Sequence, residues 1–447
     1  MIKIYDTMTR SLRDFVPLTE NVVNMYVCGP TVYNYIHIGN ARSAVAFDTI
    51  RRYFEYCGYT VNYISNFTDV DDKIIKAANE AGISTKELSD KFIAAFMEDT
   101  GQLGIKPATQ NPRVINYMDE IIAFVSTLVD KGFAYVSEGD VYFRVAKSNN
   151  YAKLANKTLE DLEIGASGRT DAETERKENP LDFALWKAAK EGEVSWDSPW
   201  GPGRPGWHIE CSVMATEILG DTIDIHGGGA DLEFPHHTNE IAQSEAKTGK
   251  TFANYWMHNG FVNVDNEKMS KSLGNFVTVH DMLQTVDGQV LRFFLATQQY
   301  RKPINFTEKA IHDAEVNLKY LKNTHSLPLT EQVNQAELQT YLDTFQEAMD
   351  DDFNTANGVT VLFDMAKWIN SGNYDQTVKD AFEKMLQVLG IVFEEEVLDE
   401  DIEKLIEERQ AARANKDFAT ADRIRDELAA QGIKLLDTKE GVRWTRD

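Results

Sequence analysis

The stretch KMSKS at 268–272 carries two lysines around a small polar centre, and Gly274 follows it closely. This composition predicts a mobile loop, and Lys268 and Lys271 bring two positive charges to it on long side chains. Such charges are suited to clamping a transferring phosphate group. A short basic run is also what a solvated surface loop contains. The stretch alone leaves both interpretations open.

Two cysteines, a histidine and a glutamate form a second set with metal-binding chemistry. Cys28 and Cys211 lie far apart in the chain, whereas His236 and Glu240 are four residues apart at the expected start of a helix. That spacing puts the imidazole and the carboxylate on one helix face. Two thiolates, one imidazole and one carboxylate are ligands that zinc accepts in a tetrahedral site. Spacing does not show that the four meet, and a lone cysteine is usually a buried small hydrophobe.

The hydrophobic pattern predicts the scaffold for these residues. We expect a strand over 21–27, a helix over about 40–57 that stops at Gly58, and a strand over 60–67. Strand, glycine turn, helix and strand form a βαβ unit. The predicted fold class is therefore α/β, a doubly wound parallel sheet that binds ligands at the carboxyl ends of its strands.

The remaining elements are predicted more coarsely. Residues 84–135 have a helical pattern, and 136–200 contain short strands and loops that suggest an insertion. The second half of the sheet domain is expected to resume at 207–211, with a strand over 223–226 and a helix from Pro235 to near Gly249. Residues 289–395 predict a helical bundle. An acidic linker near 394–401 should precede a small α+β module with helices at about 402–414 and 418–430 and strands at 433–437 and 442–446.

Composition limits the class of protein. A chain of 447 residues, 43% apolar and 26% charged, is expected to form two to four domains. It contains no apolar run of membrane-spanning length and no signal-peptide pattern, and three cysteines do not make a disulfide framework. We therefore expect a cytoplasmic protein without a membrane partner. The net charge of −25 disfavours general nucleic-acid binding, but residues 401–447 carry only −1, so RNA contact at selected faces remains open.

The motifs in combination resemble a known family. The stretch CGPTVY at 28–33 leads into HIGN at 37–40, and this pair followed by KMSKS resembles the signature motifs of class I aminoacyl-tRNA synthetases. The contexts CGPTVY, WHIECS at 207–212 and FPHHTNE at 234–240 resemble those of the zinc ligands in bacterial-type cysteinyl-tRNA synthetases. The resemblance spans essentially the whole chain. It departs at Asn40, where the family commonly has a second histidine.

The resemblance implies roles for particular residues. The implied zinc ligands, one ion per chain, are Cys28, Cys211, His236 and Glu240, and the implied catalytic residues are His37, Asn40, Lys268 and Lys271. The implied ATP contacts are Thr31, His37, Gly39, Asn40, Gly228, Asp231, Lys268 and Lys271. Gly29 and Trp207 are expected in the substrate pocket, and Arg443, Trp444 and Arg446 are expected to contact tRNA. Trp444 could also simply cover the helices of its module.

The implied domains follow the same order. They are the first half of the Rossmann-like catalytic domain (1–118), a connective insertion (119–203), the second half of the catalytic domain (204–258), a stem-contact region with the lysine loop (259–315), a helical bundle (316–398) and a C-terminal anticodon-binding module (399–447).

The resemblance implies a monomeric ligase that uses ATP with Mg²⁺, L-cysteine and tRNA(Cys). Cysteine and serine differ by one atom, and shape alone discriminates such molecules poorly. A zinc ion would favour the substrate thiolate, because a coordinated thiol loses its proton far more readily than an alcohol. Two alternatives remain. One is a ligase that joins activated cysteine to a small amine, and the other is a catalytically inactive zinc-dependent RNA-binding paralogue.

Overall fold

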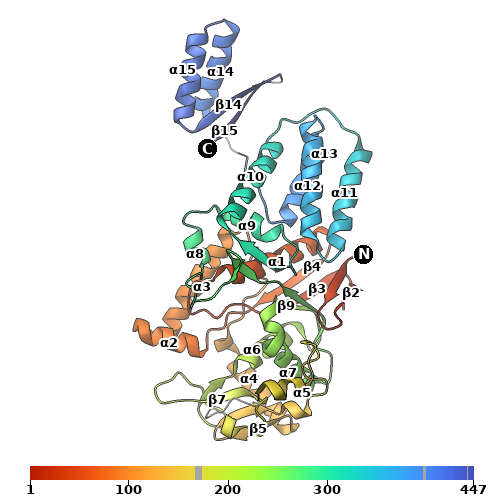
Figure 1. Cartoon of the computed structure of the whole chain (residues 1–447), viewed down its shortest axis with the longest axis vertical. Helices are drawn as coiled ribbons and strands as arrows, with labels where there is room; N and C mark the ends of the chain where they lie inside the picture. The colour runs from red at the N-terminus through yellow and green to blue at the C-terminus, as the bar shows by residue number, and fades with distance from the viewer. Residues whose placement is uncertain (167–173, 396–398, 440, 447) are drawn as a thin grey trace. The chain divides into compact units, whose positions relative to one another are not determined.

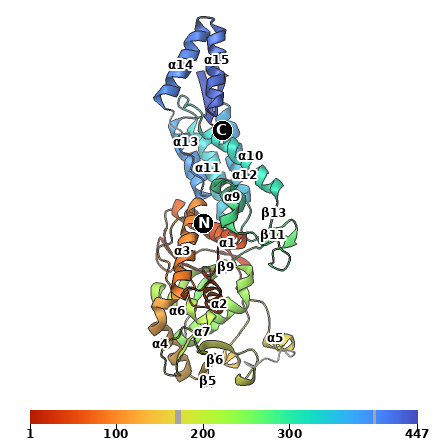
Figure 2. The ribbon, with the colours of Figure 1, turned by 90° about the vertical axis from the view of Figure 1, so that its left-hand side faces the viewer.

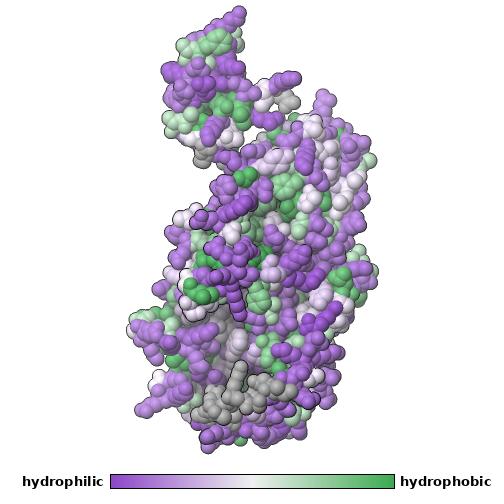
Figure 3. All heavy atoms as spheres, in the orientation of Figure 1, coloured by the Kyte–Doolittle hydropathy of each residue, from purple (hydrophilic) through white to green (hydrophobic). Residues whose placement is uncertain are grey.

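The computed structural model describes residues 1–166, 174–395, 399–439 and 441–446, and the chain divides into two compact units, Met1–Val392 and Phe393–Asp447 (Figure 1). The face drawn in Figure 3 is mostly hydrophilic, with scattered apolar side chains. None of the helices in the described ranges combines the length and the apolar composition that a membrane span requires.

A parallel sheet lies at the centre of the first unit. Its strands are β3 (Val22–Val27), β4 (Thr60–Ser65), β9 (Ile223–Gly229) and β10 (Ala253–Asn259), in the order β10-β9-β3-β4. All three neighbouring pairs are parallel. The predicted fold class is confirmed. A short N-terminal hairpin, β1 (Lys3–Asp6) with β2 (Ser11–Asp14), packs along β10.

Helix α1 (Ile38–Tyr56) makes the crossover between β3 and β4. Its buried face includes Val45, Ile50 and Phe54 at helical spacing, which packs the helix on the sheet. The chain turns after the helix at Gly58, whose φ of 94° suits glycine. The strand, helix and strand predicted for 21–67 are thus confirmed to within a few residues.

The predicted strand over 223–226 is present, and a helix precedes it in the second half of the sheet domain. Residues Trp207–Leu219 form helix α6, and the next strand, β9, starts only at Ile223. Cys211 therefore lies in a helix that is buried over Ile209–Thr216 and ends before Gly220. An irregular turn over Glu233–His237 leads into α7 (Thr238–Thr248).

The helical prediction for 84–135 is wrong in its middle. Helices α2 (Asp72–Ala81), α3 (Thr85–Gln102) and α4 (Met118–Asp130) leave residues 104–113 as a loop. Gly104, with a φ of 66°, and two prolines in this stretch explain the interruption. The insertion contains α5 (Leu159–Ala166) and an antiparallel sheet of β5 (Ala134–Ser137), β6 (Asp140–Phe143), β7 (Phe183–Ala188) and β8 (Gly203–Pro205).

After the parallel sheet the chain forms the segment that carries the lysine loop. Strands β11 (Val262–Val264), β12 (Glu267–Lys268) and β13 (Ile304–Phe306) pair, with α8 (Val279–Met282) and α9 (Gly288–Ala296) between the last two. The α9 helix packs on α1. Arg42 of α1, fully buried, donates to the carbonyls of Leu295 and Gln299 at the end of α9. This contact joins the lysine-loop segment to the helix that begins in the HIGN motif.

The predicted bundle is present. It consists of α10 (Glu308–His325), α11 (Gln335–Asp350), α12 (Thr355–Asn370) and α13 (Gln376–Val388), which lie side by side in Figures 1 and 2. Phe345, Leu362 and Phe382 are buried between them.

The second unit is a small α+β module, as predicted. Helices α14 (Glu400–Ala414) and α15 (Phe418–Ala430) precede the antiparallel pair β14 (Ile433–Thr438) and β15 (Gly441–Arg446). Ile402, Ile424, Leu428 and Ile433 form its core, and Trp444 packs against it.

Candidate active site

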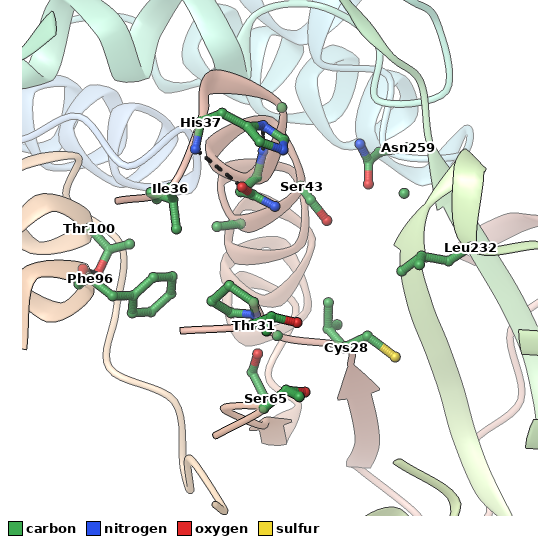
Figure 4. Close-up of a pocket in the computed structure, with 18 of the residues that line it drawn as sticks. Cys28, Thr31, Ile36, His37, Ser43, Ser65, Phe96, Thr100, Leu232 and Asn259 are labelled. Carbon is green, nitrogen blue, oxygen red and sulfur yellow. Dashed lines mark hydrogen bonds between the residues drawn. The ribbon is translucent and has the colours of Figure 1, made fainter. Parts of the chain in front are cut away.

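A cavity of about 600 Å³ opens at the carboxyl ends of the four parallel strands. Residues at or just beyond the ends of these strands line it: Cys28 after β3, Ser65 of β4, Gly229 of β9 and Asn259 of β10. Figure 4 shows His37 and Cys28 on two parts of its wall, with Leu232 and Asn259 facing them from the other side. This volume and location suit a small-molecule site.

Most of the residues predicted for the site line this cavity. They are Cys28, Gly29, Thr31, His37, Gly39, Asn40, Trp207, Cys211, Asp231, His236 and Lys268. Three lie outside the lining: Gly228, Glu240 and Lys271. A side chain on Gly228 would collide with Leu232 and His237, so this glycine provides room for packing behind the cavity.

The four predicted metal ligands converge. Their ligand atoms lie within 4.8 Å of one another, with 3.6 Å between the sulfurs of Cys28 and Cys211. Glu240 Oε2 is 3.7 Å from Cys28 Sγ and 3.4 Å from His236 Nε2. Folding therefore brings together, at the bottom of the cavity, residues that are more than 200 positions apart in sequence.

A second quartet overlaps the first. Cys28, His226, His237 and Glu240 also have ligand atoms within 4.8 Å of one another. In this set His226 Nε2 already bonds Glu240 Oε1 at 2.9 Å, and His237 Nε2 bonds Cys28 Sγ at 3.4 Å. By contrast, His236 Nε2 is buried and has no hydrogen-bond partner among the described residues. A free, buried imidazole nitrogen favours the first quartet as the metal seat.

The electrostatics of the centre fit a cation. Burial, with Cys211 and Glu240 nearby, raises the pKa of the Cys28 thiol well above its usual value, and burial also raises the pKa of Glu240. Burial lowers the pKa of His236 far below its usual range, so this imidazole stays neutral. A thiol and a carboxyl that resist ionisation without a counter-charge, as Cys28 and Glu240 do, are expected to lose their protons to a bound metal. The donor set and its burial therefore fit zinc.

Two residues that the sequence analysis missed hold this centre. Asn66 Oδ1 accepts a hydrogen bond from Gly29 N at 3.0 Å and lies 3.7 Å from Cys211 Sγ. A side chain on Gly29 would overlap the Asn66 carbonyl, which explains the glycine. Ser212, next to Cys211, donates to the carbonyl of Glu240 at 3.1 Å. Only the fold reveals such contacts.

The wall above the centre is aromatic. The Trp207 ring stacks on the His236 imidazole with 4.1 Å between centroids, and 41% of Trp207 is exposed. The Trp207 ring thus lines the cavity and packs against a predicted metal ligand.

His37 and Asn40 begin helix α1 with a reciprocal cap. Asn40 N donates to His37 Nδ1 at 3.1 Å, and His37 N donates to Asn40 Oδ1 at 3.2 Å, a contact dashed in Figure 4. Because Nδ1 accepts, the His37 proton resides on Nε2. Burial, with Lys271 and Lys73 nearby, lowers the pKa of His37 to about 4. His37 is thus a neutral donor at a helix N-terminus, a position that favours phosphate.

The lysine loop lies beside this helix end. Lys268 belongs to β12 and lines the cavity. The Lys271 ammonium lies 5.4 Å from the ring centroids of Tyr33 and Phe276, and Phe276 packs on the His37 ring. The loop is closed internally, since Ser270 N donates to Asn275 Oδ1 at 2.8 Å. Two lysines therefore lie near a neutral imidazole donor, an arrangement suited to a polyphosphate.

Comparison with known proteins defines the class. Residues 14–316 match the model of the class I (C) tRNA synthetase catalytic domain, 344–394 match the DALR domain, and 395–444 match the cysteinyl-tRNA ligase anticodon-binding domain. A methionyl-tRNA synthetase from Mycobacterium tuberculosis, solved with methionyl-adenylate, has a similar fold at 16% identity and a TM-score of 0.60, over 82% of this chain and 89% of that one. The fold and the catalytic model define a class I aminoacyl-tRNA synthetase.

Close relatives identify the family within this class. Cysteine–tRNA ligases from Streptococcus thermophilus and Streptococcus pyogenes are 95% and 83% identical to this chain, each over the full length of both sequences. The chain therefore belongs to the cysteine–tRNA ligase family. The family predicted from the motifs is confirmed, and so is the predicted ATP-dependent ligase activity, which this membership establishes.

Proposed function

We propose that this ligase selects cysteine through one zinc ion held by Cys28, Cys211, His236 and Glu240. The observation that carries the proposal is the convergence of these four side chains at the base of the cavity, with a partnerless buried nitrogen on His236. When bound, zinc would favour a substrate thiolate over a hydroxyl. Trp207 would close the pocket above the centre.

The chain's own residues would position the nucleotide. The His37 Nε2–H and the first turn of α1 would donate to the phosphates of ATP, which arrives with Mg²⁺, while Lys268 and Lys271 neutralise the departing pyrophosphate. Asp231 and Thr31 line the same cavity and would contact the nucleotide. The carboxylate of cysteine would then attack the α-phosphate, and the cysteinyl group would pass to the end of tRNA(Cys). We expect a cytoplasmic monomer with the domain boundaries given by the sequence.

Cysteine-dependent ATP–pyrophosphate exchange tests this proposal directly. The purified chain, with its zinc content measured, should support exchange with cysteine but not with serine, at about one zinc per chain. Exchange that is equally fast with both amino acids, or that persists in fully metal-free protein, would contradict zinc-based selection.

Replacing His37 with glutamine tests whether His37 acts as a neutral hydrogen-bond donor or as a cation. Since the pKa of His37 is lowered to about 4, its imidazole is uncharged from about pH 5 upward. The glutamine amide can reproduce the Nε2–H, so we expect His37→Gln to retain about tenfold more exchange than His37→Ala, which should lose about 10²–10³-fold. The pH profile above pH 5 should be the same for wild type and His37→Gln. An acid limb near pH 6.5 that disappears in the glutamine variant would contradict a neutral His37.

The module 399–447 is proposed to contact the anticodon through Arg443, Trp444 and Arg446 on β15. Trp444 is partly buried on the module's core, whereas Arg446 is exposed at the strand end. Trp444 thus fulfils the covering role considered from sequence, and any stacking on RNA would use only its remaining exposed part.

Arg446→Ala is expected to weaken tRNA binding without changing amino-acid activation. Loss of one phosphate contact should raise the KM for tRNA and reduce the salt slope of binding by about one. Pyrophosphate exchange should stay at the wild-type rate. Arg423→Ala on the exposed side of α15 is the matched control and should leave the salt slope unchanged. Equal slopes in both variants would place the RNA elsewhere.

A further inference from the structure

A line of hydrogen bonds runs from the N-terminal hairpin to the predicted metal centre. Thr7 Oγ1 is 2.7 Å from His258 Nδ1, His258 Nε2 is 2.8 Å from His237 Nδ1, and His237 Nε2 is 3.4 Å from Cys28 Sγ. Thr7, His258 and His237 are buried, with exposed fractions of 4%, 6% and 0%. None of these three lines the cavity.

The direction of donation along this line follows from its last member. A metal-bound Cys28 is a thiolate, which accepts hydrogen bonds and donates none. His237 must then carry its proton on Nε2, so its Nδ1 accepts from His258 Nε2–H. With its one proton on Nε2, His258 accepts at Nδ1, and the Thr7 hydroxyl must donate there. Each neutral imidazole carries one proton, so no other order satisfies all three contacts.

We propose that Thr7 and His258 are positioning residues that fix His237 as an N–H donor to the Cys28 thiolate, and thereby tune the metal centre. This inference rests on the proposed zinc site. Outer partners of this kind commonly orient and tune metal ligands. Donation to the sulfur withdraws charge from it, which leaves the ion more attractive to a substrate thiolate. A His237 that donates to the sulfur through Nε2–H cannot ligate the metal through the same nitrogen. His237 therefore stays outside the coordination sphere, although it belongs to the second quartet of potential ligands.

Within the described ranges, the linking nitrogens of His258 and His237 have no hydrogen-bond partner outside this line. Glu233 Oε1 is 4.0 Å from His258 Nδ1, and Glu240 Oε2 is 3.7 Å from His237 Nε2, both beyond hydrogen-bond distance. Thr7 is held independently, because its backbone N donates to the Trp256 carbonyl at 2.8 Å. Removing its hydroxyl should therefore leave the backbone in place.

Cobalt substitution tests the inference through the ligand sulfur itself. In the full-length protein with Co²⁺ in place of zinc, Thr7→Val should shift the thiolate-to-cobalt charge-transfer band to longer wavelength, because the hydrogen bond that His237 donates to the sulfur weakens when His258 loses its own donor. Zinc affinity, measured by chelator competition, should fall about tenfold or more. His258→Phe, which removes the middle link, should shift the band in the same direction. Thr324→Val, a buried threonine in α10 far from the centre, is the control and should leave the band unchanged.

The outcomes separate this inference from the site on which it rests. If wild-type protein binds about one cobalt but neither Thr7→Val nor His258→Phe moves the band or the affinity, the relay is overturned and the zinc site stands. If wild-type protein shows no thiolate-to-cobalt band, the zinc site and the relay fail together. If His237→Leu changes the number of ligands around cobalt, His237 coordinates the ion and does not donate to sulfur.

Discussion

A Cys28→Ser variant is expected to lose its bound metal and its preference for cysteine over serine. Cys28 belongs to both quartets of potential ligands found among the described residues, so its loss removes a thiolate donor from each of them. Zinc affinity should fall by more than the 10–100-fold that loss of an outer partner costs. A site without zinc must discriminate by shape, and shape separates such near-isosteres by about 100-fold or less. Metal analysis, with cysteine- and serine-dependent exchange, measures both effects.

Cys57→Ser is the matched control for this prediction. Cys57 is a partly buried thiol at the end of α1 that belongs to neither quartet. This variant should keep one zinc per chain and wild-type selectivity. A Cys28→Ser protein with full zinc content and unchanged rejection of serine would show that selection does not depend on this centre.

Lys271→Ala should reduce the rate of activation while leaving metal content unchanged. The Lys271 ammonium lies over the Tyr33 ring, which lines the cavity, and it contributes to the lowered pKa of His37. A cation that meets the pyrophosphate as charge develops acts on the transition state, so cysteine-dependent exchange should fall about 10²–10³-fold with a small change in the KM for ATP. Steady-state exchange kinetics measure this separation.

Lys309→Ala is the control for Lys271→Ala, because it removes an exposed lysine that lies on α10 and pairs with Asp313. It should exchange pyrophosphate at the wild-type rate. If Lys271→Ala instead raises the KM for ATP and keeps kcat, this lysine binds the ground state and the transition state equally, contrary to the prediction.

The sequence was most informative where chemistry depends on residue type and local spacing. The KMSKS stretch, the 28–40 region and the His236–Glu240 pair were recognisable because loops and single helix turns encode their own geometry. The βαβ unit over 21–67 followed from strand and helix periodicity, and the helical hairpin with two strands at the C-terminus followed from the same signal. The glycines Gly58 and Gly249 marked helix ends that the structure retains.

The local sequence pattern was least informative in two segments, 207–219 and 104–113. The segment beginning at Trp207 is buried on nearly all sides, with polar Glu210 and Ser212 included, so no amphipathic period in it indicated the α6 helix. The helical prediction ran through the loop at 104–113, although Gly104, Pro107 and Pro112 mark it in the sequence. Asn40, which departs from the family motif, gained its physical account only from the structure, since it completes the cap with His37.

By itself, the sequence determined which groups could bind a metal and a nucleotide. It also determined the fold class that carries them. Only the tertiary structure decided that Cys28 and Cys211 lie 3.6 Å apart, and that His236 rather than His237 has the free nitrogen. It also placed Thr7 and His258 behind the metal centre. These contacts join residues up to 251 positions apart. They arise from strand order and helix packing, which depend on interactions along the whole chain and are not encoded in any local window.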